Sequence, residues 1–253
     1  MDLSQIERYY DAVPRPVATV EEVGPFTLFV ADPATGWQFY ARPRLGLDRD
    51  VRPDDVRRVL ARQAELGVPG AVEWVDDTTP SLLPAVRAAV GGPHQLDLCP
   101  LLVLPRPADL RATTGATRVL AADDPDLPLA LGVASAAFGG RDEVTPQDPG
   151  VRRRLVERGL LVVVAAYDGS GTLVATGTAA PREDTAELMG IATLPGARRR
   201  GLGSAVTAAL VRACREAGVH DVFLTAASDE AASVYRSLGF ERRALACILG
   251  AGS

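Results

Sequence analysis

The sequence predicts a mixed α/β (α+β) protein, in which a mostly antiparallel sheet is flanked by helices. Two β-rich runs, LLVVVAAYD and TLVATGTAAP, stand on either side of a Gly-Ser-Gly turn at 169–171 and have the form of a hairpin. Elsewhere, β-rich runs alternate with segments whose apolar residues recur at helical spacing, as from Val206 to Cys214. Apolar residues make up 47% of the 253 positions, which is ample for packed cores.

The amino-terminal half contains a succession of elements that occurs again near the end of the chain. Residues 54–92 predict a helix, a Gly-Val turn, a strand and a short helix that ends at glycine, followed by a β-rich run at 96–104. Residues 203–240 give the same succession, followed by RALACILG. This similarity predicts a tandem in which each half carries one copy of the same half-fold.

A break in the apolar periodicity separates the two halves. Pro, Gly and Thr interrupt it in PRPADLRATTGA, at 105–116. We therefore predict an amino-terminal domain at 1–105, a linker at 106–115 and a carboxy-terminal domain at 116–253.

The carboxy-terminal half gives its elements in a clear order. A short strand from Thr117 precedes a helix that ends at Gly139-Gly140, and a brief helix with proline near its first turn follows. After the hairpin comes the strand AELMGIATL, and then a helix from Leu202 up to Gly218. The strand DVFLTA, a short helix closed by Gly239 and the strand ERRALACILG complete the order βααβββαβαβ.

The stretch PGARRRGLGSAV, at 195–206, lies between a predicted strand and a predicted helix. Glycines permit close backbone approach, helix starts carry unpaired N–H groups and arginines add positive charge, so each feature favours an anion. We therefore predict a phosphate-binding loop. All 27 basic residues are arginine, and a nucleotide P-loop of the form GxxxxGK[ST] requires lysine. Hydrolysis of ATP or GTP through such a loop is excluded.

The composition also restricts the partners. A formal net charge of −5 gives no long-range attraction to nucleic acid or to an anionic membrane. Three cysteines without a CxxC pair and two distant histidines argue against a disulfide framework or a zinc site, so no metal is expected. The first residues lack the pattern of a signal peptide, and no apolar run reaches membrane-spanning length. We expect a cytoplasmic monomer or homodimer.

From about residue 116 onward, the chain resembles the GNAT superfamily of N-acetyltransferases. The loop of that superfamily has the pattern [RQ]xxGx[GA], and Arg198, Gly201 and Gly203 match it at the correct spacing. The order of elements and the YxxLGF stretch from Tyr235 to Phe240 add to the resemblance. The amino-terminal half then resembles a degenerate copy of the same fold.

The resemblance implies that acetyl-CoA, or another acyl-CoA, is the acyl donor. Its pyrophosphate would lie on backbone N–H groups of the loop, and its pantetheine arm would run along the preceding strand. Ser228 takes the place where many relatives have an asparagine that contacts the arm. The alternative interpretation of Arg198 to Arg200 is an exposed basic turn that binds no phosphate. The implied cofactor-binding residues are Ile191, Ala192, Thr193, Arg198, Arg199, Arg200, Gly201, Leu202, Gly203, Ser204, Ser228 and Tyr235.

The resemblance also implies two catalytic residues. Tyr235 would lie near the thioester sulfur and donate a proton to the departing thiolate, its alternative being a packing role. Glu187 lies in an Ala-Glu stretch that is similar to one in some histone-type members, where the glutamate is the general base. The alternative is that Glu187 is an exposed strand residue without a catalytic role. Cys214 and Cys247 occupy apolar positions and are predicted to be core residues.

The sequence thus predicts transfer of an acetyl group from acetyl-CoA to a primary amine of a small molecule or peptide, by direct attack. The alternative is a noncatalytic acyl-CoA-binding regulatory module. In the first copy of the repeat, the stretch ARPRLGLDRDVRPDD replaces the phosphate loop with acids and Pro53, and Arg87 replaces the tyrosine. We therefore expect the amino-terminal half to bind no acyl-CoA.

Overall fold

The computed structural model describes residues 1–31, 40–91, 94–106, 110 and 115–251. The chain divides into two compact units, and each is described by itself. Unit 1 contains residues 1–102, 225–232 and 242–253, and unit 2 contains 103–224 and 233–241. The compact units are therefore discontinuous in sequence, whereas the domains predicted from the sequence, 1–105 and 116–253, are continuous. The predicted linker at 106–115 lies mostly outside the described residues.

Unit 1 is built on a mixed sheet with the strand order β1-β2-β3-β4-β11-β5. β1 and β2 form an antiparallel hairpin, and β2 and β3 are also antiparallel. β3 and β4 are parallel, whereas β4 pairs with β11 in the antiparallel sense. The last strand of the chain thus completes the sheet of the amino-terminal unit. The strands are β1 (Ala18–Val23), β2 (Phe26–Ala31), β3 (Ala41–Pro43), β4 (Val72–Val75), β5 (His94–Val103) and β11 (Glu241–Ala251).

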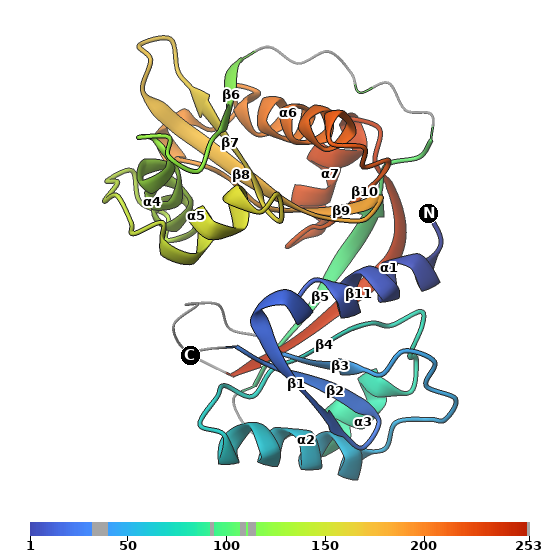
Figure 1. Cartoon of the computed structure of the whole chain (residues 1–253). Helices are drawn as coiled ribbons and strands as arrows, with labels where there is room; N and C mark the ends of the chain where they lie inside the picture. Colours follow the sequence, from blue (N-terminus) through green and yellow to red (C-terminus); the bar gives the residue numbers. More distant parts are fainter. Residues whose placement is uncertain (32–39, 92–93, 107–109, 111–114, 252–253) are drawn as a thin grey trace. The chain divides into compact units, whose positions relative to one another are not determined.

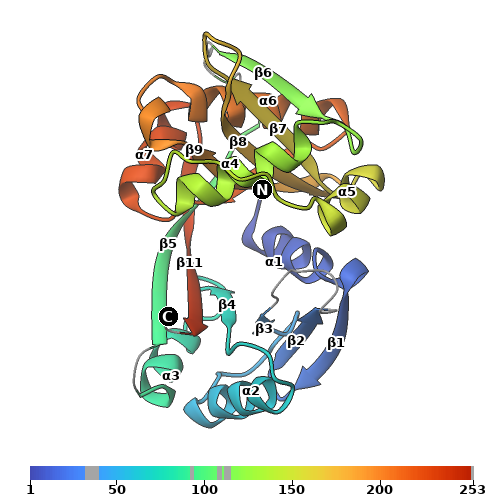
Figure 2. The ribbon, with the colours of Figure 1, turned by 90° about the vertical axis from the view of Figure 1, so that its left-hand side faces the viewer.

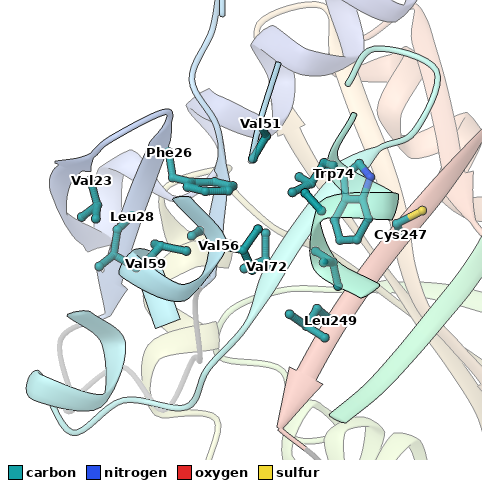
Figure 3. Close-up of a cluster of buried hydrophobic side chains, with 14 residues drawn as sticks. Val23, Phe26, Leu28, Val51, Val56, Val59, Val72, Trp74, Cys247 and Leu249 are labelled. Atoms are coloured by element: carbon teal, nitrogen blue, oxygen red, sulfur yellow. The ribbon is translucent and has the colours of Figure 1, made fainter. Parts of the chain in front are cut away.

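Helices α2 (Pro53–Glu65) and α3 (Leu82–Ala89) pack on one face of this sheet. α2 begins at a proline, which suits the first helical position, and ends before Gly67, whose φ of 67° only glycine adopts at low cost. Figure 3 shows how alternate residues of the strands supply the core beneath both helices. Its buried members include Phe26, Leu28, Val56, Val59, Val72, Trp74, Leu82, Val86, Cys247 and Leu249.

The opposite face of the same strands holds a buried cation. Helix α1 (Leu3–Ala12) precedes the short 3₁₀ helix η1 (Arg15–Val17), and α1 places Glu7 3.6 Å from the guanidinium of Arg42. Arg42 is 4% exposed, its guanidinium lies 3.9 Å from the ring centroid of Tyr10, and the Glu73 carboxylate is 3.8 Å away. Because these carboxylates lie beyond hydrogen-bond distance, burial dominates and raises the pKa of Glu73 to about 7.

Glu73 makes the stability of the protein depend on pH. The folded-state pKa is raised above the ordinary value of 4.5, so the stabilising protonated form is complete below pH 4.5 and is lost as pH rises through about 7. From pH 5 to 8, the free energy of unfolding of the wild type should fall by up to about 3 kcal/mol relative to Glu73→Gln. Urea denaturation at several pH values measures the difference. Parallel pH dependences would contradict the prediction, and Glu216→Gln, on an exposed site, is the control.

The strands of unit 2 follow the order β10-β9-β8-β7-β6. β6 to β9 are antiparallel to their neighbours, and β9 and β10 are parallel. Asp168, at the turn of the predicted hairpin, accepts hydrogen bonds from the N–H groups of Ser170 and Thr172. The strands are β6 (Ala116–Leu120), β7 (Val162–Tyr167), β8 (Leu173–Arg182), β9 (Thr185–Thr193) and β10 (Asp221–Thr225).

Helices cover both faces of these strands. α6 (Leu202–Glu216) contacts β6 to β9 on one face, and α4 (Leu127–Phe138) contacts β7 to β9 on the other, as Figures 1 and 2 show. α6 approaches closely because Gly177 of β8 has no side chain: a Cβ there would lie 2.7 Å from a Val206 methyl group. α5 (Gly150–Glu157) follows α4, and α7 (Asp229–Ser237) follows β10.

The predicted fold class and order of elements are confirmed. The carboxy-terminal half follows βααβββαβαβ from β6 to β11. The succession helix, strand, short helix, strand occurs as α2-β4-α3-β5 and again as α6-β10-α7-β11. In each copy, the first strand is parallel to the strand that precedes the first helix: β4 to β3, and β10 to β9. In the described part of the chain, every helix is too short or too polar to cross a membrane.

Candidate functional site

The loop at 194–201 connects the end of β9 to the start of α6. A short 3₁₀ turn, η3 (Pro195–Ala197), begins it, and α6 begins at Leu202, as predicted. Gly201 has a φ of 78°, which glycine adopts freely, but Arg199 has a φ of 65°. A non-glycine residue in this region costs on the order of 1 kcal/mol and persists where its surroundings hold it. The loop therefore has a defined and slightly strained backbone.

The first turn of α6 leaves its N–H groups uncapped by side chains. Gly201 is the N-cap residue and has no side chain to supply an acceptor. The first helical hydrogen bond runs from the N–H of Ala205 to the carbonyl of Gly201, at 3.0 Å. The N–H groups of Leu202, Gly203 and Ser204 precede it, and with the helix dipole they provide what an anion requires.

The arginine side chains of the loop have a different role from the one that their charge suggests. Arg198 donates from Nε to the carbonyl of Thr193 and from Nη2 to the carbonyl of Ala137, both at 3.2 Å. Arg200 donates to the carbonyl of Gly196 at 3.0 Å, and Arg199 is exposed. The side chains of Arg198 and Arg200 thus tie the loop to itself, to β9 and to the end of α4.

β9 has an unpaired edge just before this loop. Its register with β10 ends at Leu188, so the remainder of β9, from Met189 to Thr193, extends beyond the described partner strand on that side. The pairing of β9 with β8 shifts register opposite Thr176 and Thr178, and Gly190 has a φ of 59°. A main-chain edge of this kind can pair with an extended ligand. Ile191, Ala192 and Thr193, the residues predicted to contact pantetheine, lie in this part of the strand.

Tyr235 lies in the last turn of α7 and is partly buried. Its ring packs edge-to-face on Phe240, with centroids 6.2 Å apart. Burial raises the pKa of the Tyr235 phenol, which keeps it protonated at neutral pH. No described residue hydrogen bonds to this hydroxyl, so a proton can be donated to a ligand. Tyr235 and the loop at 194–201 both belong to unit 2.

The structure places the remaining predicted residues less decisively. Glu187 lies within β9, paired with Ala180 on β8 and Phe223 on β10, and it is partly buried. Ser228 belongs to unit 1, where its hydroxyl accepts from the N–H of Ala231 at 3.2 Å. Cys214 and Cys247 are fully buried, which raises the pKa of each thiol to about 12 and supports their assignment as core residues.

The amino-terminal counterpart of α6 has its first turn filled by the chain itself. At the start of α2, the Asp55 carboxylate accepts from the N–H of Arg52 at 3.0 Å. The Arg49 guanidinium binds the same carboxylate through two hydrogen bonds, at 2.8 and 3.0 Å, and holds the pKa of Asp55 below its ordinary value. Sequence reasoning noted the acids here but missed the cap, although an acid at the third helical position is its usual signal.

One cavity, of about 360 Å³, lies in unit 1 and includes none of the predicted site residues. Charged side chains from α1, η1, β1 and the segment after β3 line most of it. Arg15 pairs with Asp11 at 2.8 Å and Arg44 with Glu22 at 3.3 Å, so the lining charges satisfy one another. The cavity is therefore a poor substitute for the α6 loop as an anion site.

Comparison with known proteins gives the same assignment for the carboxy-terminal half. Residues 134–240 match the model of the acetyltransferase (GNAT) family. A GCN5-related N-acetyltransferase from Kribbella flavida has a similar structure, with a TM-score of 0.70 and 22% identity over 99% of this chain and 95% of its own. One from Sphaerobacter thermophilus gives 0.61 and 15%, over 99% and 85%. No curated protein matches the chain.

A tandem GNAT protein from the clavulanic acid biosynthesis pathway is also similar, with a TM-score of 0.56 and 15% identity over 89% of this chain and 78% of its own. At these identities the structural likeness establishes the fold. The family match covers the loop at 194–201, α6 and Tyr235. Over residues 134–240, the chain is therefore similar to the acetyltransferase (GNAT) family, a likeness that implies acyl transfer from acyl-CoA.

Proposed function

We propose that this protein transfers an acetyl group from acetyl-CoA to a primary amine of a small molecule or peptide. The observation that carries the proposal is the uncapped first turn of α6, directly after the unpaired edge of β9. Pyrophosphate accepts hydrogen bonds from the N–H groups of a helix start, and an amide-bearing pantetheine arm pairs with a strand edge. Both features lie within the segment that matches the GNAT family.

The catalytic residues act at the two ends of the transfer. Bound acetyl-CoA supplies a thioester, to whose carbonyl carbon the amine nitrogen bonds as the carbon–sulfur bond breaks. The nitrogen loses its second proton as the amide forms, and this proton restores the Tyr235 phenol through water. Tyr235 donates its phenolic proton to the departing sulfur, which its raised pKa permits at neutral pH. Glu187 accepts, directly or through water, the proton that the ammonium group must lose before attack. No covalent bond to the enzyme is needed.

The Glu187 role predicts a change in the pH dependence of the reaction. Glu187→Gln removes the group that accepts the amine proton, so the limb of the pH–rate profile that rises toward alkaline pH should flatten. Initial rates of acetyl transfer from pH 6 to 9 measure this, with Glu183→Gln, an exposed residue at the adjacent turn, as the control. A profile of unchanged shape would remove Glu187 from the mechanism.

A noncatalytic acyl-CoA-binding module is the competing function. It predicts tight binding of acetyl-CoA without release of CoA thiol in the presence of any amine. The experiment is therefore a thiol-release assay over polyamines, aminoglycosides, amino acids and peptide amino termini, alongside calorimetry with acetyl-CoA. Release that depends on an amine supports the enzyme, and binding without release across the whole set supports the module. Absence of binding would contradict both.

A further inference from the structure

We infer that Asp142 is a positioning residue, which holds the phosphate loop in the conformation that binds the acyl-CoA pyrophosphate. The inference rests on the proposed function and adds a residue outside the loop motif. Asp142 Oδ1 accepts a hydrogen bond from the N–H of Gly196, in the η3 turn, at 2.8 Å. It lies 54 positions earlier in the chain and is the side chain nearest to Gly196, where a Cβ would lie 3.3 Å from Oδ1.

Asp142 is itself held in place by contacts on both sides of it in the chain. Before it, the N–H of Arg141 donates to the Ala136 carbonyl at 2.8 Å, at the end of α4. After it, the N–H of Gln147 donates to the carbonyl of Pro128 at 3.0 Å. Between them, the backbone at Thr145 crosses α4 at Gly132, where a Cβ would lie 2.3 Å from the Thr145 carbonyl oxygen. The backbone segment that carries the Asp142 carboxylate is therefore held against α4.

The loop needs this support because its own backbone is not in a relaxed conformation. Arg199, three residues after Gly196, has a φ of 65°, and such a residue persists where neighbouring contacts determine it. Asp142 holds one end of the turn through Gly196 N–H, and Arg200 holds the carbonyl of the same residue. Arg198 connects the next part of the loop to the Ala137 carbonyl. Together these contacts fasten the loop to α4 and to the segment after it.

The charge of Asp142 cannot be what favours the cofactor. A carboxylate beside a phosphate-binding loop repels the phosphate, so its contribution must come from the hydrogen bond that it accepts. Asparagine can accept the same hydrogen bond without the negative charge, whereas alanine cannot. The two substitutions therefore separate positioning from electrostatics. A role through charge alone predicts tighter binding in both variants.

The test uses the full chain and calorimetric titration with CoA. Asp142→Ala should weaken CoA binding roughly threefold to thirtyfold, as expected for loss of one exposed hydrogen bond to a carboxylate. The KM for acetyl-CoA should rise by a similar factor with little change in kcat. Asp142→Asn should bind CoA at least as tightly as the wild type. Asp148→Ala is the matched control, because Asp148 is also exposed and accepts from a backbone N–H, that of Gly150 at 3.0 Å, without contacting the loop.

Hydrogen exchange of the free protein gives a second measurement that does not need the ligand. The amides of 196–201 should exchange faster in Asp142→Ala than in the wild type, Asp142→Asn or Asp148→Ala. Unchanged CoA affinity in Asp142→Ala, or an equal loss in Asp142→Asn, would overturn the positioning role while leaving the proposed function intact. A wild-type protein that binds neither CoA nor acetyl-CoA would contradict the proposed function itself.

Discussion

Replacing Gly203 with glutamate is expected to abolish binding of acetyl-CoA without unfolding the protein. A Cβ at Gly203 would have one neighbour within 4 Å, Thr193 Oγ1 at 3.8 Å, so the backbone has room for a side chain. An acid in the first turn also favours the helix. The carboxylate would occupy the space where the pyrophosphate binds, and like-charge repulsion of several kcal/mol corresponds to an affinity loss on the order of a hundredfold or more.

Isothermal titration measures this effect, and thermal unfolding confirms that the variant is folded. Gly169→Glu is the matched control, since Gly169 lies in a hairpin turn with nothing within 4 Å of its Cβ position. Unchanged affinity for acetyl-CoA in folded Gly203→Glu would refute the proposal that the pyrophosphate binds at the start of α6. The wild-type titration also counts sites: one per chain is expected, because the Asp55 carboxylate already lies at the start of α2, where it accepts a hydrogen bond from the N–H of Arg52. Two sites per chain would contradict the degenerate amino-terminal half.

Tyr235→Phe is expected to lower turnover by roughly tenfold to ten-thousandfold. The upper limit is typical for loss of a general acid, and the lower limit allows for a smaller contribution from Tyr235. The substitution removes one hydroxyl that no described residue binds, and the edge-to-face contact with Phe240 is kept. Cofactor affinity and stability should therefore change little. Steady-state kinetics with saturating acetyl-CoA and a productive amine, together with the titration, separate the two quantities.

Tyr167→Phe is the matched control for this prediction. The Tyr167 hydroxyl donates to Asp126 at 2.7 Å and accepts from Arg118 at 2.8 Å, near the start of α4. Its loss should lower the stability of unit 2 by about 1 kcal/mol and leave kcat unchanged. If Tyr235→Phe turns over as fast as the wild type, Tyr235 is a packing residue and another group protonates the thiolate.

Local patterns in the sequence predicted most elements of the fold, but not all of their pairings. Periodicity and turn residues are local, so the hairpin at 169–171 and the start of α6 could be predicted. The pairing of β11 with β4 could not, because nothing in RALACILG specifies VEWV as its partner. Arg42 shows the same limit: its position in an alternating strand does not reveal that Glu7 and Glu73 flank it.

In the candidate site, too, local features could be predicted from the sequence, whereas contacts between distant segments could not. The spacing of Gly201 and Gly203 predicted where α6 begins, and its first turn is uncapped there. The orientation of Arg198 depends on a carbonyl of α4, and that of Gly196 on Asp142, 54 positions away. Contacts between distant segments leave no periodic signal in a single sequence. The roles of Tyr235, Glu187 and Ser228 in binding or catalysis stay predictions.

The position of β11 has a consequence for how the chain folds during synthesis. In unit 1, β11 lies between β4 and β5 in the strand order, so the sheet of the first hundred residues has a missing central strand until residue 251 has left the ribosome. Domains usually fold in the order in which they are made, and long sequence separations between paired strands slow folding. Unit 1 can therefore mature only after β11 has been synthesised. A premature stop near residue 240 would damage the beginning of the protein more than its middle.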